Sequence, residues 1–180
     1  MNSPFFIDFL KVVSEYAKIY ETFEMIQKDG RHDFMPVHGD QKTGIIGESF
    51  VYEYFKRNNM QDITFGGASE KGWDIEFSEN NIVKKIQVKT VSIFSKTRTI
   101  SPIHYGWDEL YLVSLNTLFQ PDNIWVVKLD NVKNWKGKKN IAGLKMPKND
   151  TATCFNTKWF DSVENITTKF YCKFTELKKS

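Results

Sequence analysis

The chain has 180 residues, of which 41% are hydrophobic and 26% charged, and 25 basic against 22 acidic side chains give a formal net charge of +3. This composition excludes a disordered chain, and the length is that of one domain that can bury a core without metals or disulfides. No apolar run approaches the ~18 residues of a membrane span, and Asp8 interrupts an N-terminus that lacks the basic start of a secretory signal. We therefore expect a cytoplasmic protein without a membrane partner.

The N-terminal third is predicted to be helical. Apolar residues recur at three- and four-residue steps over residues 5–28, and Ser3 and Pro4 suit the cap and the first helical position. The polar residues 29–43 predict a loop, and a second helix is expected from about Thr43 to Asn58.

The pattern then changes to short apolar segments that predict strands. They are Ile63–Phe65, Trp73–Phe77, Val83–Val91, Leu110–Leu115 and Ile124–Lys128. A four-residue turn, Ser78–Asn81, joins the second and third segments into a hairpin. We assign no element to residues 150–180, which mix aromatic and polar residues.

This order of elements predicts an α/β domain with a mixed central sheet flanked by helices. We expect one domain over residues 1–180. It would comprise an N-terminal helix and loop (1–40), a core (43–128) that carries the candidate site described next, and a basic segment and tail (129–180).

The hairpin carries the most informative polar residues. Asp74 and Glu76 share one face of the first strand, and Gln87 and Lys89 share one face of the second. A carboxylate is a hard oxygen ligand suited to Mg²⁺, and the Gln87 amide and the Val88 carbonyl are possible neutral ligands. Lys89 adds a positive charge that can hold a phosphate or an attacking water. This grouping suits metal-assisted hydrolysis of a phosphodiester.

The second helix offers another carboxylate. Gly44, Glu48, Val51 and Phe55 lie along one stripe of that helix. Glu48 thus lies on the apolar face, where a carboxylate is costly unless it is paired or binds a cation. The small residues Gly44 and Gly47 would let the helix approach the sheet closely.

These residues resemble the motifs of the PD-(D/E)XK nuclease superfamily, which has the restriction-endonuclease-like fold. The resemblance covers about residues 43–92 and rests on Gly44-Ile-Ile-Gly-Glu48, on Lys71-Gly-Trp-Asp74 and on Gln87-Val-Lys89. In that superfamily a helix glutamate, a hairpin aspartate and an acid-x-lysine strand build the metal site. The resemblance implies catalytic residues Glu48, Asp74, Gln87 and Lys89, and Mg²⁺, for which Mn²⁺ can substitute, held by Asp74, Glu48, Gln87 and Val88.

Two residues depart from the motif. Trp73 replaces a proline, a common exchange, whereas Gln87 replaces the usual acid and removes one negative ligand. Either Glu48 compensates for that loss or metal binding is weakened.

Basic residues suggest where a nucleic acid would bind. Lys96 and Arg98 lie in a polar loop after the catalytic strand, and His104 follows in a turn-like aromatic segment. Lys136, Lys138 and Lys139 belong to a stretch without acids between Asp130 and Asp150. Such segments can follow phosphates. The alternatives are a solvated loop for the lysines and a structural role for His104.

The resemblance favours a type II restriction endonuclease that cuts double-stranded DNA as a homodimer, because two strands need two active sites. A DNA repair or junction-resolving nuclease is an alternative within the same class. A non-catalytic nucleic-acid-binding protein with the same fold is an alternative from another class, which Gln87 keeps open.

Overall fold

The computed structural model describes residues 4–29, 41–66, 72–133, 135, 138–147 and 159–177. Its centre is a six-stranded sheet in the order β1-β2-β3-β5-β6-β8. The strands are β1 Gln61–Phe65, β2 Ile75–Glu79, β3 Ile82–Ser92, β5 Glu109–Leu115, β6 Pro121–Lys128 and β8 Glu164–Asn165. β3 pairs parallel to β5 while the other neighbours are antiparallel, so the sheet is mixed.

Three α-helices and a second small sheet complete the described chain. The helices are α1 Pro4–Asp29, α2 Gln41–Arg57 and α3 Thr167–Tyr171, and Leu129–Asn131 form a short 3₁₀ helix. β4 Ile103–His104 pairs with β7 Asn140–Ile141. The α/β class with a mixed sheet and flanking helices is thereby confirmed. None of the described helices combines the length and apolarity that crossing a membrane requires.

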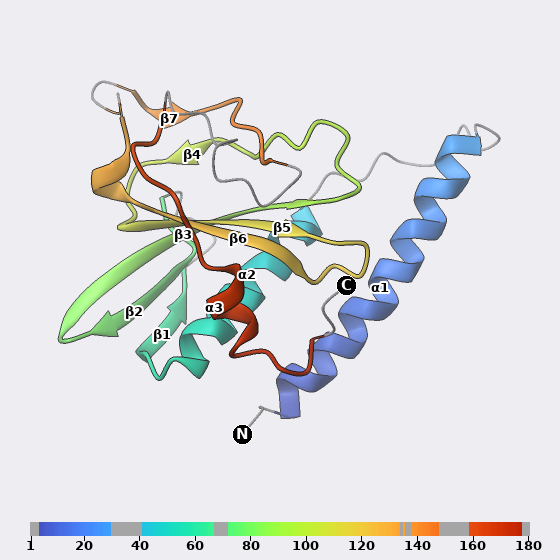
Figure 1. Cartoon of the computed structure of the whole chain (residues 1–180), viewed down its shortest axis with the longest axis horizontal. Helices are drawn as coiled ribbons and strands as arrows, with labels where there is room; N and C mark the ends of the chain where they lie inside the picture. The colour runs from blue at the N-terminus through green and yellow to red at the C-terminus, as the bar shows by residue number, and fades with distance from the viewer. Residues whose placement is uncertain are drawn as a thin grey trace.

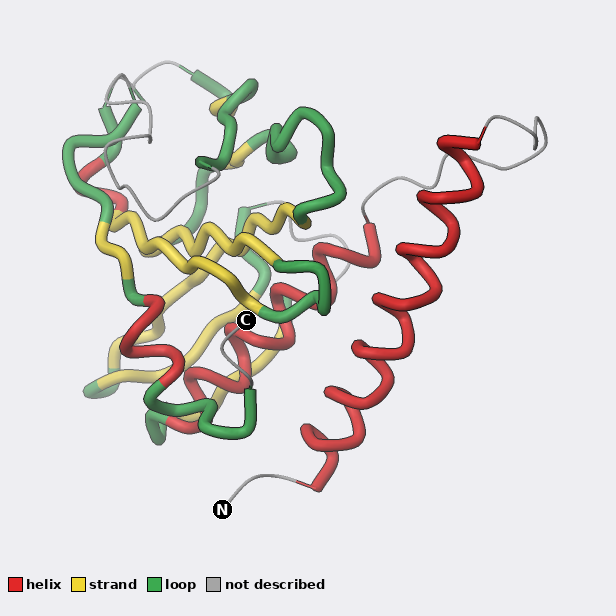
Figure 2. Tube along the Cα trace, turned by 45° about the vertical axis from the view of Figure 1, so that its right-hand side comes forward, coloured by secondary structure: helices red, strands yellow, loops and turns green. Residues whose placement is uncertain are grey.

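Alternating side chains of the strands fill two cores, one on each face of the sheet. Ile86 and Val113 face the core that α1 and α2 cover, and Leu112 and Trp125 face the core beneath β4 and β7. Figure 1 and Figure 2 show the long helix α1 along one side of the molecule and the loop-rich layer with β4 and β7 on the other. Both faces of the central strands are therefore buried.

The predicted helices and the predicted hairpin are confirmed, with one correction at the turn. We predicted a four-residue turn over Ser78–Asn81, but β2 continues through Glu79 and only Asn80 and Asn81 form the loop. Their φ angles of 52° and 64° are those of a two-residue turn that matches the strand twist. The prediction was wrong because asparagine tolerates positive φ, which allows the shorter turn.

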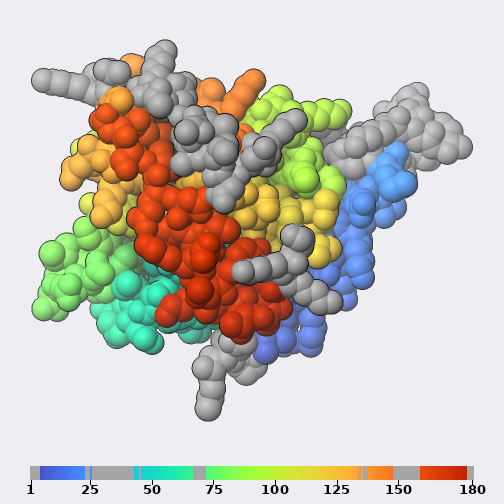
Figure 3. All heavy atoms as spheres, viewed as in Figure 1, coloured from blue at the N-terminus to red at the C-terminus, as the bar shows by residue number. Residues whose placement is uncertain are grey.

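The segment without a predicted element completes the core between α1 and α2. The rings of Phe170 and Phe174 stack at 4.1 Å, and Phe174 lies 5.5 Å from Phe6 of α1. Figure 3 shows this C-terminal segment, in red, lying against the start of α1. Arg57 at the end of α2 donates to Glu176 over 2.6 Å, so α2 is also joined to this segment.

Candidate active site

A cavity of about 350 Å³ lies between α2 and the middle of β3. It gathers side chains from α2, from the residue before β2, from β3 and from the loop that follows β3. Its lining consists of Gly44, Glu48, Asp74, Val88, Lys89, Thr90, Thr99 and Ser101. Glu48, Asp74 and Lys89, three of the four predicted catalytic residues, therefore meet at one cavity.

Gly47 sets the distance between α2 and β3. A Cβ atom added to Gly47 would lie 1.9 Å from Oγ1 of Thr90, so only glycine fits between helix and strand at this crossing. The predicted close approach is confirmed at this residue. Gly44 differs, because its Cβ would meet only Oε1 of Glu48 at an ordinary 3.8 Å. The crossing at Gly47 holds Glu48 beside the strand that carries Lys89.

Asp74 is placed by hydrogen bonds to β3. Its backbone N donates to the carbonyl of Ile86 over 2.8 Å, and its Oδ2 accepts from the backbone N of Val88 over 2.7 Å. The carboxylate thus takes the position of a strand carbonyl, just before β2 begins at Ile75. Because the N–H and C=O of a strand residue point to the same edge, the Val88 carbonyl is directed to the side of Asp74.

Burial disfavours the charged form of each ionisable group in the cavity. Burial, reinforced by Asp74 and opposed by Lys89, raises the pKa of Glu48 to about 7. Burial also raises the pKa of Asp74, against the opposing effects of the Val88 N–H and Lys89. It lowers the pKa of Lys89, although both carboxylates counteract it. A bound cation would restore both carboxylates to their charged forms.

The donor set fits a hard divalent cation. Glu48, Asp74 and Val88 line the cavity and offer two carboxylates and a backbone carbonyl, and Mg²⁺ typically takes one or two carboxylates with water and phosphate oxygens. No group of three or more His, Cys, Asp or Glu side chains within the described ranges is placed to hold a metal ion. Oγ1 of Thr90 is buried against Gly47 and has no hydrogen-bond partner in the described chain.

Gln87 is used differently from its neighbours on β3. Its side chain is 1% exposed, its Nε2 donates to the carbonyl of Gly72 over 3.1 Å, and its Oε1 accepts from the N of His104 over 3.2 Å. The amide therefore ties β3 to the segment before Asp74 and to β4. Gln87 does not line the cavity, and its role as a ligand stays a prediction.

The three DNA contacts predicted after β3 differ in their exposure to solvent. Lys96 is exposed, whereas Arg98 is 8% exposed and points into the protein. His104 is half-buried, and its carbonyl accepts a hydrogen bond from Nε1 of Trp107 over 2.8 Å. Of these three residues, only Lys96 offers an open surface charge.

The predicted contacts in the basic stretch are described in part. The ammonium of Lys138 lies 4.2 Å from the centroid of the Trp159 ring, and Lys139 is exposed. Lys136 lies outside the described residues. DNA contact by these lysines stays a prediction.

Three polar residues of the cavity were not among the predicted site residues. Thr90 follows Lys89 directly, and Thr99 and Ser101 alternate in the polar loop where we expected DNA contacts. The signal for Thr90 is a polar residue on the strand face that otherwise carries the apolar Ile86 and Val88.

No family model matches this chain, and no curated protein matches it. Among solved structures, a bacterial homing endonuclease is similar at 15% sequence identity, with a TM-score of 0.38. That alignment covers 63% of this chain and 80% of the endonuclease. A TM-score this low transfers no functional residue, so the function has to be inferred from the cavity.

Proposed function

We propose that the protein is a Mg²⁺-dependent DNA endonuclease whose active site is the cavity between α2 and β3. The observation that supports this most is the meeting of Glu48, Asp74 and Lys89 there, where burial disfavours the charge of each. Titratable groups with perturbed pKa values in one cleft are a frequent property of active sites.

Each residue has a distinct role in this proposal. Glu48, Asp74 and the Val88 carbonyl would hold the cation. When bound, Mg²⁺ supplies charge stabilisation at the phosphodiester and activates water. The Lys89 ammonium orients the attacking water and stabilises charge that develops on the phosphate oxygens. Gln87 positions this arrangement by fixing β3 to Gly72 and His104.

The motif resemblance supports a type II restriction endonuclease that acts on double-stranded DNA as a homodimer. A repair or junction-resolving nuclease would use the same cavity. One observation favours a non-catalytic nucleic-acid-binding protein as the second candidate. The strand position that usually supplies an acid carries Gln87, whose amide is engaged by two backbone partners.

The decisive experiment replaces Asp74 with asparagine. Asp74→Asn keeps an oxygen that accepts from the Val88 N–H but removes one charge, so it should stay folded and cleave plasmid DNA on the order of 10²–10³-fold more slowly. Glu76→Gln is the matched control, since Glu76 lies two residues away and reaches Thr64 at 3.5 Å instead of the cavity.

Cleavage is measured with Mg²⁺ and with EDTA on linear, supercoiled and branched DNA. Discrete fragments from duplex DNA support restriction, and cleavage of branched DNA alone supports junction resolution. Equal rates for Asp74→Asn and the parent would contradict the proposed site. DNA binding without cleavage under any divalent cation would support the non-catalytic candidate.

A further inference from the structure

A second cavity, of about 400 Å³, lies where the chain leaves β3. It is lined by Ile93, Ser95, Lys96, Arg98, Ser114, Leu115 and Asp122. The loop after β3 borders both cavities, because Lys96 and Arg98 line the second and Thr99 and Ser101 line the first. The two cavities therefore have one loop in common as a wall.

Arg98 is built into the wall of this second cavity. Its Nε donates to the Met146 carbonyl over 3.3 Å, and its Nη2 donates to Oγ of Ser114 over 2.8 Å and to the Pro147 carbonyl over 2.7 Å. All three acceptors are neutral. Nη1 makes no hydrogen bond within the described chain, although a guanidinium has five N–H groups to place. The guanidinium group is thus held in place by three hydrogen bonds, and the two N–H groups of Nη1 make none within the described chain.

The positive charge of Arg98 is only partly balanced. No described carboxylate forms an ion pair with Arg98, burial lowers its pKa, and Asp122 raises it from across the cavity. A buried charge is costly unless an opposite charge compensates it. With Lys96 and Asp122 included, the described residues of the lining carry one excess positive charge.

We propose that the second cavity is a subsite for one phosphodiester group of a polynucleotide whose scissile phosphodiester occupies the first cavity. This inference rests on the proposed function for its substrate class. A phosphodiester carries a single negative charge, which matches the single excess positive charge of the lining. The two N–H groups of Nη1 are left to donate to the phosphate oxygens, and Lys96 can close over the same group from the exposed side.

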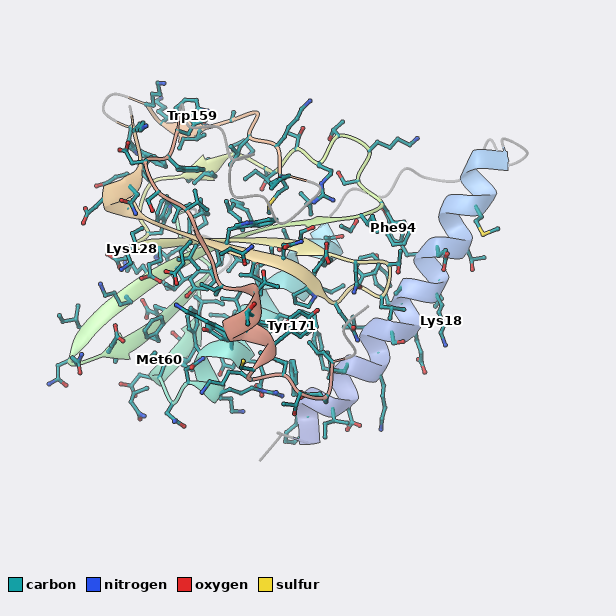
Figure 4. All side chains as sticks on the ribbon, in the orientation of Figure 1. Lys18, Met60, Phe94, Lys128, Trp159 and Tyr171 are labelled. Atoms are coloured by element: carbon teal, nitrogen blue, oxygen red, sulfur yellow. The ribbon has the colours of Figure 1, made fainter. Side chains whose placement is uncertain are left out.

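Charge variants test the subsite through equilibrium binding of a fluorescent DNA duplex in EDTA, where cleavage does not occur. Lys96→Gln should weaken binding about 3- to 10-fold and lower the slope of log affinity against log salt by about 0.9, the value for one phosphate contact. Asp122→Asn should tighten binding about 2- to 5-fold, because it removes the opposing charge. Structural damage would not tighten binding. Lys18→Gln, on α1 and directed away from the sheet (Figure 4), is the control and should change neither quantity.

A backbone scan locates the contact. Duplexes that each carry one uncharged methylphosphonate linkage should bind the parent more weakly at one linkage, and Lys96→Gln should reduce the difference at that linkage alone, because Arg98 still faces the same phosphate. The subsite is overturned if Lys96→Gln keeps the parent's salt slope or if Asp122→Asn does not tighten binding. If the parent protein binds DNA but never cuts it, the proposed nuclease function is overturned, and the binding test of the subsite still applies. A parent that does not bind DNA overturns both.

Discussion

Glu48 shows how burial sets the chemistry of a single side chain. Its pKa of about 7 means that the carboxylic acid must lose a proton before it can bind a cation near neutral pH. We predict that Mg²⁺ affinity rises about tenfold per pH unit below pH 7 and levels off above it. Glu48→Gln should bind Mg²⁺ more weakly and without this pH dependence. Calorimetric titrations between pH 5.5 and 8.5 measure both, and an unchanged profile in Glu48→Gln would assign the dependence to another group.

The same shift predicts an effect on stability. A carboxyl whose pKa is raised on folding contributes stability below its unfolded value of 4.5, and this contribution is lost as the pH rises through about 7. Glu48→Gln resembles the protonated form, so it should be more stable than the parent at pH 8 and nearly equal to it at pH 4. Urea unfolding at both pH values, with Glu15→Gln on the exposed side of α1 as control, measures the difference.

Single residues also mark the limit of prediction from sequence. Glu48, Asp74 and Lys89, which line one cavity, could be named as candidates because a charge at a fixed spacing within an apolar helix or strand is visible in the sequence. The hydrogen-bond partners of Gln87 and Arg98 could not be predicted in this way. Gly72, His104 and Pro147 lie in or beside loops, and their approach to these side chains depends on the finished fold. The sequence placed Glu48 on an apolar face, but it did not show that Gln87 and Arg98 become buried.

At the scale of elements, the crossing of α2 over β3 is the geometry on which the site depends. Gly47→Ala would push its methyl group into Thr90, so we expect a loss of about 1–3 kcal/mol in the free energy of unfolding and a displaced Glu48. Gly44→Ala, one turn earlier in the same helix, has room for the methyl group and should gain about 0.5–1 kcal/mol from helix propensity. Chemical denaturation compares the two. Equal stabilities would show that the crossing tolerates a larger spacing.

Elements with a repeated pattern were predictable and isolated ones were not. β3, β5 and β6 are long enough for their apolar residues to show a pattern, and the predicted strands fall within them. β4, β7 and β8 have two residues each, which is too short for any period to appear. They form because pairing partners elsewhere in the fold offer hydrogen bonds, so their existence depends on tertiary structure.

At the scale of the whole molecule, Arg57 links α2 to the C-terminal segment. Its side chain bonds Glu53 over 3.1 Å and Glu176 over 2.6 Å, and its guanidinium lies 4.1 Å from the centroid of the Phe174 ring. Arg57→Met leaves two carboxylates without their partner, so we predict a loss of about 2–3 kcal/mol in the free energy of unfolding. The exposed pair Lys169–Glu164 is the control, and Lys169→Gln should leave that free energy within experimental error.

The pH dependence of this link has the opposite sign to that of Glu48. Burial raises the pKa of Glu176, but the hydrogen bonds from Arg57 outweigh burial and lower it overall. The stability that this carboxylate provides is therefore present above pH 4.5 and is lost as the pH falls through its lowered pKa. The difference in stability between the parent and Arg57→Met should shrink in acid. A constant difference down to pH 3 would assign the effect to packing on Phe174.

The contact between Phe6 and Phe174 has a consequence for how the protein is made. The ribosome produces Phe6 early and Phe174 only 168 residues later, a delay of roughly 10–30 s at 5–20 residues per second. Until then the apolar face of α1 lacks one of its partners, and Phe50 lacks both Phe170 and Phe174. A nascent chain can form α2 and the hairpin, but it cannot close the core around them. The cavity between α2 and β3 therefore gains its fully packed surroundings only after residues 170–174 have been made, so a fragment that ends before them should lack the proposed activity.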